Sequence, residues 1–228
     1  MSETDFEKHI LTGIDDYVLQ ARQCIPGRDA LFLMARCYFE NKLTKDAKIL
    51  VVGAGGGEEI VSLGKYNPSW SFVGVDLSEK MLKLAHIRIQ QEDLKNDVQL
   101  HRKEVFNLEE RDFDAATCFL TLHFVPDDGS KLKILQTIKT KLKPNSPFIL
   151  VDAAAMKETA EFRDDVLAWK RHAQNNGMPP EHLDKLVENT MNVPFVTEDR
   201  ELELLASSGF KQIKKMYQGT WIHGWLSQ

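Results

Sequence analysis

The sequence lacks the features that mark disulfide-stabilised, metal-binding or membrane-spanning proteins. Its three cysteines, Cys24, Cys37 and Cys118, form no C-x-x-C spacing, so we expect packed, reduced thiols. The histidines form no H-x-x-x-H pair, and we expect no metal site. No apolar run approaches the ~18 residues of a membrane helix. The acidic N-terminus has no apolar signal core, so we expect a cytoplasmic protein.

Positive charge is also in short supply. Lys and Arg total 29 against 34 Asp and Glu, which gives a net charge of −5. A chain of this charge has no overall attraction for a polyanion, which argues against nucleic acid as its partner. The length of 228 residues suits one well-buried domain, and the hydrophobic content of 43% is ordinary for a globular protein.

A glycine-rich turn follows the first strongly apolar segment. The run from Ile49 to Val52 ends at Gly53, and Gly55, Gly56 and Gly57 follow before an expected helix. Glycines allow positive φ and let a ligand approach the main chain, and the first N–H groups of the helix point towards that ligand. The alternative is that these glycines only pack a helix closely on a strand.

A carboxylate ends the next buried strand, Ser71 to Asp76, 19 residues after Gly57. In doubly wound α/β folds ligands lie outside the carboxyl ends of the strands, where such an acid binds the hydroxyls of a ribose. Both nicotinamide and S-adenosylmethionine (SAM) proteins use this arrangement. The dinucleotide fingerprint G-x-G-x-x-G requires glycine at position 58, which is Glu58 here, and a glutamate would repel a pyrophosphate. SAM, which carries no phosphate, is therefore the expected cofactor.

Strands and helices alternate regularly after residue 46, as a parallel sheet with right-handed crossovers requires. The expected strands are 48–53, 71–76, 97–101, 113–119, 148–151, 211–217 and 220–226, the last two forming a hairpin around Gln218 and Gly219. The expected helices are 5–23, 29–43, 57–65, 78–92, 129–142, 158–175, 180–190 and 198–208. We therefore predict a Rossmann-like α/β fold with a seven-stranded, mostly parallel sheet. Residues 1–45 form a helical cap and residues 46–228 the cofactor-binding domain.

The G-x-G-x-G spacing of Gly53, Gly55 and Gly57, together with this order of elements, resembles class I SAM-dependent methyltransferases. The resemblance covers most of the chain after residue 45 and implies methyl transfer, with S-adenosylhomocysteine as the product. Carried over by position, it implies cofactor contacts at Gly53, Ala54, Gly55, Gly57, Asp76, Leu77, Glu104, Val105, Phe119, Leu120 and Arg28. The family's acid two residues before the first glycine is Val51 here, so Glu58 or Glu59 would have to hold the ammonium of SAM.

A closer resemblance is to the carboxy-SAM synthase of the tRNA wobble-uridine pathway. It rests on four short motifs, namely Ile25-Pro-Gly27, Thr121-Leu-His-Phe124, Glu188-Asn189 and Ser208-Gly-Phe210. The position of the synthase's carboxylate-binding arginine corresponds to Asp184, which would repel that carboxylate, although the neighbouring Lys185 could supply the positive charge. A carboxy-SAM synthase or a SAM-binding protein without transfer activity is therefore the alternative.

The acceptor is expected to be a small or medium-sized organic molecule. The segment after the fourth strand, Phe119-Leu-Thr-Leu, lacks the acidic or Asn residue followed by Pro-Pro-aromatic of amino-methyltransferases acting on nucleobases. His123, just past that strand, is the first candidate for a general base, because imidazole titrates near neutral pH. His172 is the second candidate, and Tyr17 in the cap is a third. Each has the alternative of being a packed side chain.

Residues 153–192 exceed what a crossover needs and contain two expected helices broken at Gly177-Met-Pro-Pro180. We predict that they form a lid with the N-terminal helices and determine acceptor specificity. Trp221, His223 and Trp225 alternate along the last strand, where they belong either to the core or to an exposed edge. If these side chains lie on an exposed edge, that edge is a possible contact in a homodimer.

Overall fold

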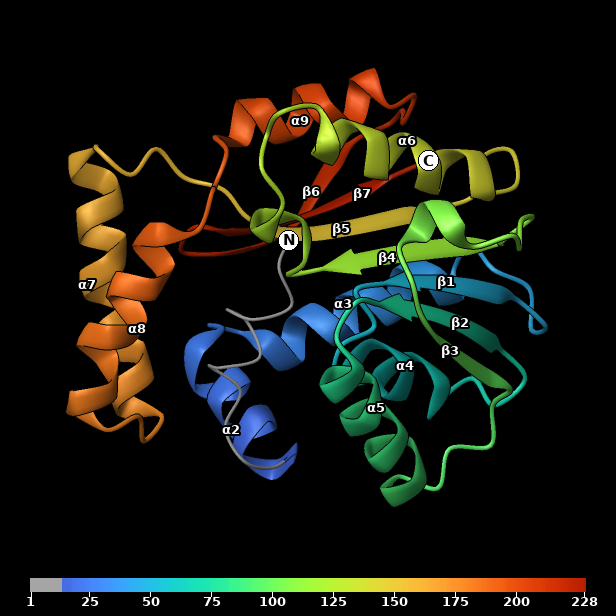
Figure 1. Ribbon diagram of the computed structural model, residues 1–228, viewed down its shortest axis with the longest axis horizontal. Coiled ribbons are helices and arrows are strands. Elements are labelled where there is room, and N and C mark those ends of the chain that lie inside the picture. The colour runs from blue at the N-terminus through green and yellow to red at the C-terminus, as the bar shows by residue number, and fades with distance from the viewer. Residues whose placement is uncertain (1–13) are drawn as a thin grey trace.

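The computed structural model describes residues 14–228, with side chains described from Leu19 onward. From Lys48 the chain alternates strands and helices that build one continuous sheet with helices on both faces (Figure 1). The strands are β1 (Lys48–Val52), β2 (Ser71–Asp76), β3 (Val98–Arg102), β4 (Ala115–Phe119), β5 (Phe148–Ala153), β6 (Lys214–Gly219) and β7 (Ile222–Ser227).

From Arg28 onward the helices agree with the predicted ranges to within a few residues at each end, while residues 5–13 of the first predicted helix lie outside the described residues. They are α2 (Ile14–Cys24), α3 (Arg28–Glu40), α4 (Glu58–Gly64), α5 (Glu79–Gln91), α6 (Ser130–Lys141), α7 (Ala160–Asn175), α8 (Pro180–Asn192) and α9 (Glu198–Ser207). Two short 3₁₀ helices, η1 (Val105–Asn107) and η2 (Leu122–Phe124), follow β3 and β4. The hydroxyls of Ser78, Thr159 and Thr197 cap α5, α7 and α9 by accepting from backbone N–H groups of their first turns.

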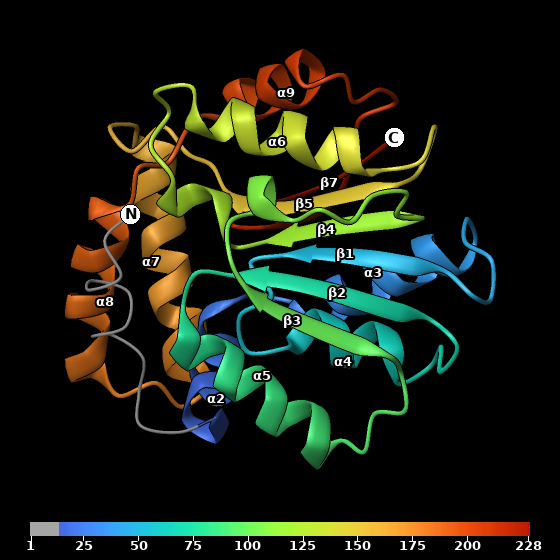
Figure 2. The same cartoon turned by 45° about the vertical axis from the view of Figure 1, so that its right-hand side comes forward.

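The strand order confirms the predicted Rossmann-like fold. The seven strands lie in the order β3-β2-β1-β4-β5-β7-β6, and the first five are parallel. β7 pairs antiparallel with β5 and with β6 (Figure 2). The strand order reverses between β1 and β4, so the carboxyl ends of β1, β2 and β4 lie at the switch point where ligands bind in such sheets.

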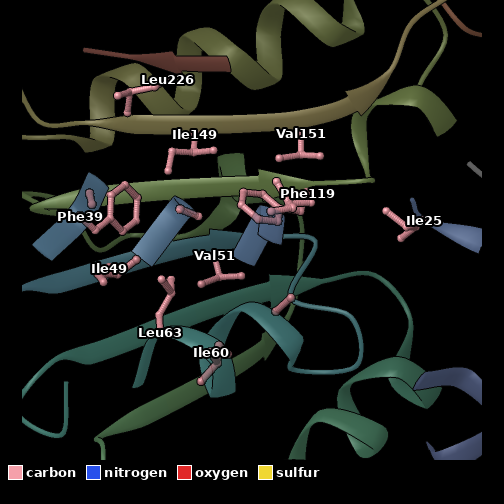
Figure 3. Packing of buried hydrophobic residues seen from close by; sticks show 14 of the residues in the cluster. Ile25, Phe39, Ile49, Val51, Ile60, Leu63, Phe119, Ile149, Val151 and Leu226 are labelled. Carbon is pink, nitrogen blue, oxygen red and sulfur yellow. The ribbon is translucent and has the colours of Figure 1, made fainter. Parts of the chain in front are cut away.

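Two hydrophobic cores lie on the two faces of the sheet. Ile49, Val51, Phe119 and Val151 point from the sheet towards Ile60 and Leu63 of α4 and Phe39 of α3 (Figure 3). Leu50, Cys118 and Leu150 point to the opposite face, where Leu135 of α6 and Leu204 of α9 cover them. All these strand residues are buried, because a parallel sheet covered on both faces requires apolar side chains at successive positions.

The C-terminal hairpin differs from its prediction in where it turns. We expected the turn at Gln218 and Gly219, whereas both belong to β6 and the chain turns at Thr220 and Trp221. Thr220 has a positive φ of 55°, which is unusual for a β-branched residue and which the sequence did not indicate. β7 is also an internal strand, and Trp221, His223 and Trp225 are all buried within the chain. These three side chains therefore do not form the exposed edge on which the dimer expectation rested, and dimerisation stays a prediction.

The cap and the insertion pack against each other beside the sheet. α7 and α8 stand beyond one end of the strands, with α2 next to α7 (Figure 1). The indole N–H of Trp169 on α7 donates to the carbonyl of Cys24 at 2.5 Å, and the Tyr217 hydroxyl donates to the carbonyl of Pro26. These bonds fix the loop between α2 and α3. In residues 14–228, no helix combines the length and apolar character needed to cross a membrane.

Candidate active site

The glycine turn at the end of β1 brings the main chain close to two neighbouring segments. Gly53 has a φ of 74°, and a Cβ there would lie 1.9 Å from the hydroxyl oxygen of Thr121 after β4. Gly55 has a φ of 39°, and its Cβ would point towards the Met81 and Asp76 side chains. A side chain at either position would therefore crowd the turn and the space beside it.

Asp76 connects the end of β2 to this turn. Its Oδ2 accepts the Gly55 N–H at 2.9 Å and its Oδ1 accepts the Ser78 N–H at 2.8 Å. Burial raises the pKa of Asp76 above its usual value, and the backbone N–H groups of Ser78, Gly55 and Leu77 partly offset this rise. The carboxylate thus holds the glycine turn in place and still borders the space outside it.

A cavity of about 860 Å³ opens at the carboxyl ends of β1, β2 and β4. Its size lies within the usual range for a small-molecule site, roughly 300–1,000 Å³. Every cofactor-binding residue expected from the sequence except Gly57 lines it, namely Gly53, Ala54, Gly55, Asp76, Leu77, Glu104, Val105, Phe119, Leu120 and Arg28. The fold thus brings together residues spread over more than 90 positions of the chain, from Arg28 to Leu120.

Gly57 has a different role from the one expected. It lies outside the cavity lining, and a Cβ there would come within 3.1 Å of the Ala85 backbone on α5. Gly57 directly precedes the first residue of α4 and has a φ of 76°. The close approach of α5 at this point requires glycine. The packing explanation therefore applies to Gly57, while Gly53 and Gly55 border the ligand space.

Arg28 joins the cap to the glycine turn through a buried ion-pair network. Its guanidinium lies 2.5 Å from the Glu58 carboxylate and 4.9 Å above the Phe32 ring. Arg88 of α5 pairs with the same carboxylate oxygen of Glu58. Helices α3, α4 and α5 thus meet at one carboxylate whose charge is matched by two arginines.

Several cavity residues were not predicted from the sequence. Phe32, on α3, lies 5.7 Å from Phe119 between ring centroids, while Met81 of α5 and Phe106 of η1 also line the cavity. Their apolar side chains share the hydrophobic periodicity of core residues, so the sequence did not separate them from the core. Leu120 has a positive φ of 51° immediately after β4, a backbone conformation of the kind found at ligand sites.

His123 is buried behind the cavity wall. Its Nδ1 contacts the Asp152 carboxylate of β5, and its ring packs on Phe124 at 4.2 Å between centroids. The His123 side chain lies outside the cavity lining of the described residues, although its neighbours Leu122 and Phe124 are part of that lining. In this arrangement His123 fixes the segment after β4 and does not face the ligand space.

Of the other two candidate bases, only His172 has a described side chain. His172 lies on α7, where the amide N–H of Asn176 reaches its Nδ1 at 3.4 Å, and it lies outside the lining. Tyr17 is on α2, but its side chain lies outside the described residues. Asp184 is 87% exposed and pairs with Lys170, and Lys185 is also exposed. No residue of 153–192 lines the cavity as described, which differs from the expected contribution of this segment to the acceptor site.

Comparisons with known proteins agree with this geometry. Residues 43–209 match a family model described as a methyltransferase domain. The chain belongs to the class I SAM-dependent methyltransferases. It is 22% identical over 217 residues to the carboxy-S-adenosyl-L-methionine synthase of Campylobacter hominis, covering 94% of this chain and 89% of that protein. It is 27% identical over 171 residues to the demethylmenaquinone methyltransferase of Lactobacillus johnsonii, covering 70% and 66%.

A solved structure shares the fold over nearly its whole length. The SAM-dependent methyltransferase of Aquifex aeolicus superimposes with a TM-score of 0.61 at 19% identity, covering 95% of this chain and 98% of that one. Membership of the family implies SAM as the cofactor, and the site fits it. Gly53 and Gly55 line the cavity, where a Cβ at Gly53 would meet Thr121 and one at Gly55 would meet Met81, and Asp76 stands where a ribose is bound in this fold.

Proposed function

We propose that this methyltransferase acts on a small or medium-sized organic acceptor that binds in the apolar part of the cavity. The proposal rests on the apolar side chains in the part of the cavity wall that lies beyond the residues assigned to the cofactor. Ile25 and Phe32 come from the cap, and Phe124 and Val125 come from the segment after β4. An acceptor of largely apolar surface suits this wall, because its burial there is favourable.

The chemistry asks little of the protein beyond positioning. SAM supplies an electrophilic methyl group, so the residues of the chain have to align the acceptor and exclude water. The apolar wall of the cavity serves to exclude water. A general base is needed only for an acceptor that must lose a proton. The predicted bases are His123, which contacts Asp152, then His172 and Tyr17, and the structure as described places neither histidine in the cavity lining.

The proposal is tested by measuring S-adenosylhomocysteine release with a panel of small phenols, amines and carboxylic acids, and with a short RNA. Val125→Asp should raise the KM of an apolar acceptor by about tenfold or more, since burying a carboxylate beside it is unfavourable, and should leave cofactor affinity unchanged. Val193→Asp, the same change outside the cavity, is the control. Turnover of RNA and of no small acceptor would contradict the proposal.

A second candidate is a carboxy-SAM synthase or a SAM-binding protein without transfer activity. It is favoured by the Campylobacter hominis relative, which aligns over nearly the whole chain. It is disfavoured by Asp184 and Lys185, because the described structure places no positive charge from α8 in the cavity. Mass spectrometry of the ligand that co-purifies separates the two candidates, since carboxy-SAM is heavier than SAM by one carboxyl group. A cytoplasmic location and a homodimer remain predictions.

A further inference from the structure

Glu59 is a buried acid in the cavity wall with an incompletely satisfied carboxylate. It lies in the first turn of α4 and is 5% exposed, and its Oε1 makes no hydrogen bond to any described residue. The Thr117 hydroxyl of β4 lies beside the Glu59 carboxyl group and lowers its pKa by hydrogen bonding, and it has no other hydrogen-bond partner among those residues. A buried carboxylate oxygen without a donor is costly. A ligand that brings a donor to this point would remove that cost.

The other two acids beside the glycine turn have their charges matched by the protein. Glu58 is paired with Arg28 and Arg88, and Asp76 accepts N–H groups from Gly55 and Ser78. Glu59 is therefore the acid whose charge the described protein leaves to be matched.

Glu59 supplies a carboxylate close to the position on β1 where the family has an acid and this chain has Val51. Val51 of β1 is the direct neighbour of Thr117 on β4, and both point to the sheet face that α4 covers. The side chain of Glu59 comes down from α4 to the Thr117 side chain. A carboxylate thus stands above Val51, although the strand itself supplies none.

We propose that Glu59 binds the ammonium group of the methionine end of SAM, with the Thr117 hydroxyl beside it. The sequence alone left Glu58 and Glu59 as equal alternatives for this role. The ion pairs of Glu58 decide between them, because an acid already shared by two arginines has little to offer a further cation. The inference rests on SAM as the cofactor and is independent of which acceptor is methylated.

If Glu59 binds the ammonium group, cofactor binding should change the protonation of the Glu59 carboxyl group. The pKa of Glu59 is raised to about 8, chiefly by burial and also by the charges of Glu58 and Asp76, while Thr117 and Arg28 partly offset the rise. Burial also raises the pKa of the Cys118 thiol, on the opposite face of the sheet, so this thiol remains uncharged. Free Glu59 is then mostly protonated at pH 7 and must ionise to bind the ammonium. Binding should release close to one proton at pH 7 and strengthen as the pH rises from 6 to 8.

The test compares two ligands on three proteins by calorimetry. The ligands are S-adenosylhomocysteine and its deamino analogue, which lacks only the ammonium group. The wild-type protein should bind the deamino analogue about 10- to 100-fold more weakly. Glu59→Gln should bind both ligands with nearly equal affinity. Glu109→Gln, the same change at an exposed position, should behave as the wild type does.

The proton count provides a second measurement that needs no variant. Titrations at pH 7 in buffers of different ionisation enthalpy should show release of about one proton with S-adenosylhomocysteine and none with the deamino analogue. Equal affinity of the wild-type protein for both ligands, or no proton release, would overturn the role of Glu59 and leave the cofactor assignment intact. Failure of the wild-type protein to bind S-adenosylhomocysteine at all would overturn both.

Discussion

At the carboxyl end of β2, Asp76 serves both the ribose site and the glycine turn, so its removal should affect cofactor affinity strongly. Asp76→Ala is expected to weaken S-adenosylhomocysteine binding by about 1.5–3 kcal/mol, because a charged acceptor of hydrogen bonds is lost. Part of the loss comes from the Gly55 N–H, which loses its partner. Calorimetric titration measures the effect.

Asp46→Ala is the matched control for that variant, since Asp46 is exposed at the opposite end of β1. It should bind S-adenosylhomocysteine with the affinity of the wild type. An unchanged dissociation constant for Asp76→Ala, with the fold intact by circular dichroism, would place the adenosine elsewhere in the molecule.

The residues that the sequence placed well are those whose role follows from local backbone geometry. Gly53, Gly55 and Asp76 end strands that can be recognised from short apolar runs, and strand ends converge in a parallel sheet. The sequence could not distinguish Glu58 from Glu59, because Arg28 and Arg88, which pair with Glu58, are about 30 residues away on either side. Such pairings depend on how three helices pack, which a local pattern does not contain.

At the scale of the elements, Glu58 is the point at which the cap helix α3 meets α4 and α5. Glu58→Gln would leave the buried Arg88 guanidinium without its ion pair, and Arg28 with only the exposed Asp29 carboxylate at 3.8 Å. We expect the free energy of unfolding to fall by about 3 kcal/mol, as is typical when one partner of a buried ion pair is removed. Urea denaturation of this variant, with Glu109→Gln as the exposed control, measures the effect. A loss no larger than that of the control would show that the network contributes little to stability.

The turn between α7 and α8 tests the predicted lid. Met178 is buried there against Ala173 and Leu183, and Trp169 ties α7 to the cap, which borders the cavity. Cofactor binding that orders the cap should therefore also protect residues 175–180 from proteolysis. Limited digestion should cut this turn more slowly in the presence of S-adenosylhomocysteine, while cutting in the 91–97 connection should be unchanged. Equal rates in both states would make the segment a fixed part of the fold.

The elements themselves were largely predictable, and their contacts were less so. Apolar runs and capping residues located the helices and strands, because both are local signals. The hairpin turn was misplaced because Gln218 and Gly219 are better turn formers than Thr220 and Trp221, and strand pairing overrode that preference. The expected place of residues 153–192 over the cavity rested on their length and composition, which do not specify the side on which a helix pair packs.

For the whole molecule, the buried acids predict how stability depends on pH. The pKa of Glu201 is raised to about 8, chiefly by burial and also by the charge of Asp152, while the hydrogen bond that the Trp225 indole donates to the carboxylate partly offsets the rise. Unfolded Glu201 ionises from about pH 4.5, so folding takes up a proton between there and pH 8. The stabilisation is complete at low pH and is lost as the pH rises through this range.

We therefore expect the free energy of unfolding to fall by about 1 kcal/mol or more between pH 6 and pH 8. Urea denaturation at several pH values measures the change. Glu201→Gln keeps the size and polarity of the side chain and should make the fall over this interval smaller, and the remaining fall comes from Glu59, whose pKa is also raised to about 8. A wild-type profile that rises from pH 6 to pH 8 would contradict the assignment.

The central claim is that the carboxyl ends of β1 and β2 form a SAM site, and direct titration of the wild-type protein tests it. SAM and S-adenosylhomocysteine should each bind at one site per chain, and NAD should not bind, because Glu58 occupies the position where a pyrophosphate requires glycine. Each of the two SAM-type ligands should also raise the melting temperature. Saturable binding of NAD, or the absence of any heat with either SAM-type ligand, would contradict the account.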